Sequence, residues 1–234
     1  MIILAVAALA WAASRRWPIV IGSVVTLLLI GYFDMWEDTM RTISMIIVCT
    51  LISLVVGIPV GIAMARSRRV RSVISPILDV MQTLPSFVYL IPVVMLMGIG
   101  RVPGLIAVVI YAIPPIIRLT DLGIRLVNKE VLEASDAFGS SSWQKLVNVQ
   151  LPLAMPTIMT GINQTIMMAL AMVVIASMIG VQGLGQPVLR AINNQYFTMG
   201  IFNGLAIVGI AIIFDRISQA FGQRLQRHKE LGHA

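Results

Sequence analysis

Long runs without a charged residue limit what this sequence can fold into. The runs at 42–65, 80–100 and 191–214 are each long enough to cross a lipid bilayer, because a helix rises about 1.5 Å per residue and the hydrocarbon core is about 30 Å thick. Only 12% of the residues are charged and the mean hydropathy is +0.93, which excludes an ordinary soluble domain. The sequence therefore predicts an all-α membrane protein.

Four further runs complete the expected set of spans. They lie at 1–14, 17–33, 102–117 and 153–179. The helix at 102–117 is expected to continue to Arg125, and prolines and glycines limit the last run at both ends. The run at 1–14 is short, so the total is seven spans, or six if this run does not cross. Because Arg15 and Arg16 follow it rather than precede it, we do not expect a cleaved signal peptide.

The positive charges indicate an orientation. Lys and Arg gather in alternate loops, and such loops stay in the cytoplasm. With the loop at 66–71 inside, only Arg41, Arg101 and Arg190 fall outside. The C-terminus, with a tail at 222–234, is then cytoplasmic. Because the basic residues flank spans in several short loops, the net charge of +7 does not predict a nucleic-acid surface.

Residues that could perform catalysis are scarce. The only histidines, His228 and His233, lie in the polar tail, and the single Cys49 lies within a span as an apolar filler. No phosphate-binding loop and no cluster of metal ligands occurs in the sequence. We therefore expect no catalytic residue, no metal site and no cofactor in this chain, and an enzyme is the least favoured class.

Ionisable residues do not mark a proton pathway through the spans. Asp79, Asp121 and Asp215 all fall at expected cytoplasmic ends, whereas a proton relay would need such groups deeper in the membrane. Arg118 and Arg125 lie three before and four after Asp121, a spacing that predicts pairing along one helix face. Proton-coupled transport is therefore disfavoured.

The segment at 128–152 belongs to neither neighbouring span. Val131, Ala134 and Phe138 recur at helical spacing and give a short helix an apolar face. Gly139 follows where a helix commonly turns left-handed, and Ser140–Ser142 can cap a second helix. A helix-turn-helix at the cytoplasmic side is expected. Composition alone favours an amphipathic linker at the membrane interface.

The sequence EASDAFGSSSWQKLVNVQLP in this segment resembles the signature loop of ABC importer permeases. The residues that carry the resemblance are Glu133, Ala134, Ser135, Gly139, Leu151 and Pro152. Ser135 and Val149 depart from the usual alanine and isoleucine, and both changes conserve size. In that family the loop docks on a separate ATP-binding subunit. The resemblance therefore implies coupling to ATP hydrolysis, with ATP and Mg held by the partner.

Other stretches extend the resemblance over about 42–219. PILDVMQTLPSFVYLIPVVMLMGIGRVPG, YAIPPIIRLTDLGI and GLGQPVLRAI are similar to permeases of the glycine betaine and proline betaine importers. The resemblance implies a type I ABC importer fold in a bacterial cytoplasmic membrane, with a five-helix core at 39–221 and one or two N-terminal helices at 1–33. It also implies cytoplasmic ATPase subunits, an extracytoplasmic substrate-binding protein and a second, identical permease copy. The expected substrates are glycine betaine, proline betaine, choline or carnitine.

Two groups of residues are candidates for the translocation pathway. The first is a polar and sulfur-containing stripe comprising Thr160, Asn163, Gln164, Met167 and Met168. It could instead form hydrogen bonds between helices. The second is Phe87 and Tyr89, whose rings could hold a quaternary ammonium by cation-π interaction or simply pack. The outer loops at 34–41 and 180–198, notably 182–187, are the expected docking sites for the binding protein.

Two other classes of membrane protein remain as alternatives. A self-sufficient osmolyte channel or release pore would need no ATPase. A structural scaffold would show no ATP hydrolysis stimulated by substrate. The 128–152 segment is the feature that favours the importer over both.

Overall fold

The computed structural model describes residues 6–8, 11 and 17–230, with side chains up to residue 222. No strand occurs among these residues. The main helices are α2 (Trp17–Tyr32), α3 (Trp36–Arg66), α4 (Arg68–Thr83), α5 (Leu90–Met97), α6 (Arg101–Ala112), α7 (Pro114–Arg125), α8 (Lys129–Ala137), α9 (Ser142–Gln144), α10 (Leu151–Ala176), α11 (Gly185–Asn194) and α12 (Phe197–Glu230). Short 3-10 helices cover Ser86–Tyr89 and Ser177–Ile179, and a π-helix covers Lys145–Gln150.

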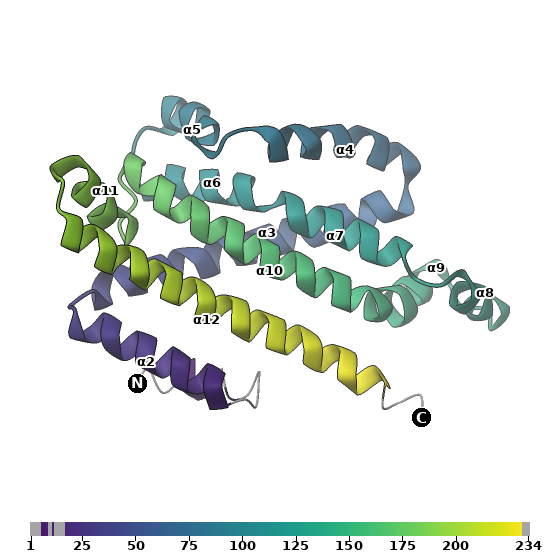
Figure 1. The fold of residues 1–234 in the computed structure, drawn as a ribbon. Helices are drawn as coiled ribbons and strands as arrows, with labels where there is room; N and C mark the ends of the chain where they lie inside the picture. The colour runs from purple at the N-terminus through teal and green to yellow at the C-terminus, as the bar shows by residue number, and fades with distance from the viewer. Residues whose placement is uncertain (1–5, 9–10, 12–16, 231–234) are drawn as a thin grey trace.

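Long apolar helices form a bundle, and they lie side by side in Figure 1. In the described part of the chain, four helical runs are long and apolar enough to cross a membrane: Trp36–Arg66, Arg101–Arg125, Ser142–Ile179 and Phe197–Gly222. The bent pair Arg68–Thr83 and Ser86–Met97 makes a fifth if it counts as one span. The expected five-helix core is therefore confirmed. The extension of the span at 102–117 to Arg125 is confirmed as well.

Glycines let α3 approach α7 closely. A Cβ on Gly57 would lie 2.4 Å from Cγ2 of Ile116, and one on Gly61 would lie 2.6 Å from Cβ of Thr120. These two glycines are spaced as in the small-xxx-small pattern by which membrane helices pack. The contact fixes α7 against the centre of the bundle.

A second pair of glycines joins α7 to α10. A Cβ on Gly123 would lie 3.0 Å from Cβ of Thr157, and one on Gly161 would lie 3.0 Å from Cβ of Leu119. Buried apolar side chains, including Ile116 and Ile158, fill the same region. Because α7 and α10 flank the 128–152 segment, this packing holds both of its ends.

The run expected as a span at 80–100 is not one continuous helix, and the helical part of this region begins earlier, in α4. Residues 80–83 complete α4, and α4 meets the helical residues 86–97 at an angle of 114°. The break lies at Leu84 and Pro85, both with extended ψ angles of 133° and 141°. The residue before a proline is driven out of the α conformation, so the chain turns here. Each half alone is too short to cross the bilayer.

The two connections expected to lie outside the membrane also differ from expectation in their structure. Most of the expected loop at 34–41 is the first turn of α3, which begins at Trp36. The expected loop at 180–198 contains α11, and the left-handed Gln195 (φ 58°) separates α11 from α12. Residues 191–194 therefore belong to α11 and not to the last span. At its other end α12 continues to Glu230, well into the expected tail.

The N-terminal helix α2 lies along α12 at one edge of the bundle (Figure 1). Leu27 and Ile30 of α2 are buried in the main core together with Ala206 and Ile210 of α12. The helix has 16 residues, about 24 Å at 1.5 Å per residue, so it only just approaches the thickness of the hydrocarbon core. The other expected N-terminal span, at 1–14, lies largely outside the described residues.

Candidate functional site

The 128–152 segment begins with a capped helix. The side chain of Asn128 accepts a hydrogen bond of 3.0 Å from the backbone N–H of Glu130, which starts α8. At the other end the N–H of Phe138 donates to the carbonyl of Ala134 at 3.1 Å. Capping satisfies backbone groups that a short helix would otherwise leave unpaired. The predicted first helix is confirmed.

A sharp turn follows, as the sequence predicts. Gly139 has φ of 75°, in the left-handed region where a side chain would be strained. Ser141 then accepts from the N–H of Gln144, while the Gln144 side chain accepts from the N–H of Ser141. This capping box begins α9. The helix-turn-helix is therefore specified by local residues.

The turn is tied to its surroundings by a charge pair and a buried side chain. Lys145 forms an ion pair with Asp136, linking the second helix back to α8. Leu146 is 1% exposed and packs with Ile124 of α7 and Ala154 of α10. The π-helix at Lys145–Gln150 connects without a break to α10. The second helix is therefore attached both to α8 and to α10.

Most of α8 is not covered by the rest of the chain. Phe138 is 90% exposed, and Glu133, Ala134 and Val131 on the same short helix are exposed too. The apolar face that the sequence predicts is thus directed away from the bundle. Figure 1 shows α8 and α9 beyond the ends of α7 and α10. An exposed aromatic side chain on a well-held helix is suited to contact another protein.

The remaining residues of the signature lie on the inner side. Ser135 is buried, and its hydroxyl has no hydrogen-bond partner among the described residues. Leu151 packs against the core that contains Leu146, and the half-buried Pro152 lies in the first turn of α10. The signature therefore combines an exposed face with an anchored base.

The candidate pathway stripe on α10 divides into two groups. Thr160 and Gln164 are exposed, whereas Asn163, Met167 and Met168 are half-buried. Thr160 donates to the carbonyl of Pro156 within its own helix. Thr160 and Gln164 are four residues apart and share an uncovered face of α10.

Asn163 makes a contact between helices. Its amide Nδ2 donates to the carboxylate of Asp215 on α12 at 3.0 Å. Asp215 also accepts from Gln219 at 2.7 Å. The amide oxygen of Asn163, Oδ1, is buried without a partner among the described residues. For Asn163 the structure favours the packing interpretation that the sequence left open.

The aromatic candidates also differ from each other. Tyr89 is buried, its hydroxyl donates to the carbonyl of Met81, and its ring meets that of Tyr111 edge-on with centroids 5.5 Å apart. Phe87 is 53% exposed. The two rings therefore do not form one cage, and the packing interpretation fits Tyr89.

Sequence reasoning missed a network of charges between α4 and α7. Arg71 donates to Asp121 across 50 residues of sequence, and Arg125 pairs with the same carboxylate as predicted. The predicted pairing of Asp121 with Arg118 is wrong, because Arg118 pairs with Asp79 of α4. The sequence shows charged residues near the helix ends, but it does not show that Arg71 and Arg118 each pair with a carboxylate on another helix.

At the end of the bundle opposite α8, a buried hydroxyl links α3 to the segment before α11. Thr42 of α3 accepts a hydrogen bond of 2.9 Å from the N–H of Leu184 and donates to the carbonyl of Asp38. Gly183, Leu184, Gly185 and Pro187 are buried, so Gln182 is the only fully exposed residue of the expected docking stretch at 182–187. Exposed apolar residues at this end include Ile192, Tyr196 and Phe197.

No group of His, Cys, Asp or Glu among the described residues could hold a metal ion.

Comparison with known proteins agrees with a transport role. Residues 57–227 match the family model described as "Binding-protein-dependent transport system inner membrane component". The chain is 53% identical to the glycine betaine/carnitine transport permease protein GbuB of Listeria monocytogenes over 90% of this chain and 74% of that protein.

Two further comparisons extend this result. The glycine betaine/proline betaine transport system permease protein ProW of Escherichia coli is 52% identical over 87% of this chain, which spans 57% of its length. A solved structure of the MetNI methionine ABC transporter, in an inward-facing conformation, shares the fold with a TM-score of 0.73 at 20% identity, covering 83% of this chain and 97% of that one. The chain is therefore a transport permease that belongs to the family of binding-protein-dependent transport system inner membrane components.

Proposed function

We propose that this chain is the permease subunit of an ATP-driven importer for glycine betaine or a related methylated ammonium compound. The names of two relatives at 52–53% identity, glycine betaine/carnitine and glycine betaine/proline betaine permeases, support this substrate class. Choline belongs to the same chemical class. We place the protein in a bacterial cytoplasmic membrane with the α8 end and the C-terminus inside, following the distribution of Lys and Arg.

The observation that carries the proposal is the uncovered helix α8. Phe138 is 90% exposed at the end of a helix that is capped, ion-paired and anchored between α7 and α10. We assign this surface, with Glu133 and Ala134, as the docking site of a cytoplasmic ATPase subunit. Closure of two such subunits around ATP would move α8, and the packed α7 and α10 would follow.

The uncovered face of α10 supports a second permease copy. Thr160 and Gln164 lie on this face, exposed and within a span. Polar side chains in lipid are expected to face protein or water, so a symmetric partner would place them at or beside a shared pathway. On the outer side, Ile192, Tyr196 and Phe197 offer an exposed apolar surface for a substrate-binding protein.

The docking assignment can be tested with a matched pair of exposed aromatic residues. We expect Phe138→Ser to abolish co-purification of the ATPase and ATP-driven uptake, because it removes the large exposed apolar side chain at the end of α8. Tyr196→Ser changes a residue that is 59% exposed at the other end of the bundle, and it should leave the ATPase bound. Retention of the ATPase by the Phe138 variant would overturn the assignment.

The channel alternative has its own test. Vesicles that contain only the permease should release no preloaded glycine betaine down its gradient. Rapid release without any ATPase would show that the protein is a self-sufficient pore.

A further inference from the structure

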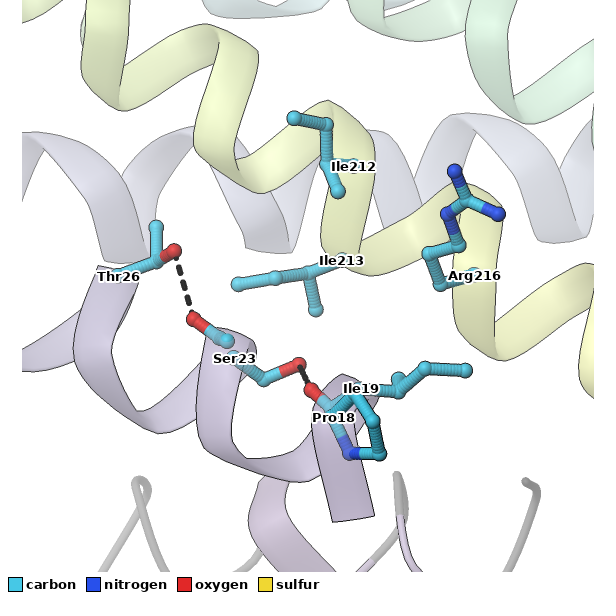
Figure 2. A pocket seen from close by; sticks show the side chains of 8 residues that line it. Pro18, Ile19, Ser23, Thr26, Ile212, Ile213 and Arg216 are labelled. Carbon is cyan, nitrogen blue, oxygen red and sulfur yellow. Dashed lines mark hydrogen bonds between the residues drawn. The ribbon is translucent and has the colours of Figure 1, made fainter. Parts of the chain in front are cut away.

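A groove opens between the N-terminal helix α2 and the last helix α12. It has a volume of about 420 Å³ and is lined by Pro18, Ile19, Gly22, Ser23, Thr26, Ile212, Ile213 and Arg216. Figure 2 shows residues from the two helices around it. We call it the α2–α12 groove.

The groove exists because α2 and α12 are in close contact only between the end of α2 and Gly209 of α12. The rings of Phe33 and Phe202 lie 4.4 Å apart. Next along the helices, a Cβ on Gly209 would lie 2.4 Å from Cγ2 of Thr26. Beyond this contact a Cβ on Gly22 would meet nothing within 4 Å. The helices therefore touch near Gly209 and leave space toward Pro18 and Arg216.

The lining is apolar apart from one charge. The hydroxyls of Ser23 and Thr26 donate to carbonyls of their own helix, at Ile19 and Gly22 (Figure 2). Among the described residues that line the groove, Arg216 is the only charged one. No carboxylate lies within ion-pair distance of its guanidinium in the part of the chain whose side chains are described.

The position of Arg216 along α12 is the one expected for a residue at the membrane surface. It lies about 28 Å along the axis of α12 from Phe197, at about 1.5 Å per residue, which is close to the thickness of the hydrocarbon core. Trp17, at the same end of α2, is 65% exposed, and tryptophan is typical of the headgroup region. We therefore expect the charged end of the groove at headgroup level, with its apolar part extending into the bilayer.

We propose that the α2–α12 groove binds one anionic phospholipid. One of its acyl chains would lie against Ile19, Ile212 and Ile213, and its phosphate would accept hydrogen bonds from Arg216. Arginine matches phosphate geometry through paired N–H donors, and basic pockets between membrane helices are suited to anionic headgroups. The bound lipid would fill the space between α2 and the bundle, so it would stabilise the attachment of the N-terminal helix.

The test compares two lipids with identical chains. The full-length permease in its detergent-purified complex is incubated with equal amounts of dioleoylphosphatidylglycerol and dioleoylphosphatidylcholine, and retained lipid is counted by native mass spectrometry. The wild-type chain should retain one phosphatidylglycerol in preference to phosphatidylcholine. Both lipids offer a phosphate, but only the net negative phosphatidylglycerol gains from the charge of Arg216. Arg216→Gln should therefore lower this preference about fivefold.

A second variant separates the groove from simple surface attraction. Gly22→Leu should fill the groove and expel the lipid while Arg216 remains. Gly31→Leu is the matched control, because a Cβ on Gly31 also meets nothing within 4 Å on the same helix but away from the groove; this variant should retain the lipid. Equal retention of the two lipids by the wild type, or an unchanged preference in the Arg216 or the folded Gly22 variant, would overturn the proposal. Arg216 is exposed, so its variant decides the result even if the Gly22 variant does not fold.

Discussion

Arg71 of α4 donates a hydrogen bond of 2.8 Å to the carboxylate of Asp121 on α7. Asp121 is 5% exposed, and its second oxygen accepts from Arg125 at 3.0 Å. One buried carboxylate is thus held between two guanidinium groups from different helices. The interaction fixes the start of α4, the first half of the bent pair, against the central helix of the bundle.

Removing the charge of Asp121 should destabilise the protein. Asp121→Asn leaves Arg71 and Arg125 facing each other without their shared anion, and we expect a loss of about 2 kcal/mol in the free energy of unfolding. The control is Asp79→Asn, which breaks the pair with Arg118 where the carboxylate side chain is 64% exposed. That change should cost less than about 1 kcal/mol. Thermal unfolding in detergent measures both, and equal losses would contradict the difference in burial.

The contact between α3 and α7 gives a second stability prediction. Gly61→Ala would place a Cβ 2.7 Å from the carbonyl oxygen of Ile117, so the helices must separate, at a cost of about 1–3 kcal/mol. Gly204→Ala is the control, because its added Cβ meets nothing within 4 Å on α12 and alanine favours a helix. The Gly61 variant should unfold at a lower temperature than the wild type and the Gly204 variant should not. A Gly61 variant as stable as the control would show that α3 and α7 are not closely packed.

Local features were predictable from the sequence, and features between helices were not. The turn at Gly139 and the serine cap depend on residues within a few positions, so their pattern predicted them correctly. The pairing of Arg71 with Asp121 joins residues 50 apart, and the sequence offered only the neighbours of Asp121 on its own helix. Arg125 was therefore identified and Arg71 was not.

The bent pair shows a second limit. The absence of charge at 80–100 predicted a span. Hydropathy, however, does not show whether the helix axis bends within such a run. The Leu84–Pro85 step was visible, and its extended conformation follows from proline sterics. Whether a proline kinks a helix or ends it depends on packing, here of Leu78 against Met64 and Ile117. The same reasoning explains why the buried position of 183–185 was not predicted, since it depends on Thr42 of α3.

The turn of the 128–152 segment offers a test of coupling. Gly139→Val would force a β-branched residue to φ of 75°, at a cost of roughly 1–2 kcal/mol or more. A Cβ there meets nothing within 4 Å, so any effect comes from the backbone and not from a clash. We expect the protein to insert normally and to lose uptake together with transport-linked ATP hydrolysis. Gly139→Asn is the control, because asparagine tolerates this conformation and should retain most activity. Full uptake by the valine variant would separate the turn from coupling.

The stripe on α10 gives a test in which packing and transport lead to different results. Asn163 donates to Asp215 of α12, so Asn163→Leu removes a hydrogen bond within the bundle and should lower stability by about 1–2 kcal/mol. Gln164 is the next residue but is exposed and makes no such contact among the described residues. Gln164→Leu should therefore leave the unfolding temperature unchanged.

If this face lines the pathway beside a second copy, the Gln164 variant will assemble normally and transport more slowly, because an amide that can contact the methylated cation has been replaced. Uptake per assembled complex, measured in proteoliposomes with the ATPase and binding protein present, distinguishes the cases. Normal uptake with weakened assembly would assign Gln164 to packing between copies and would remove this stripe from the pathway.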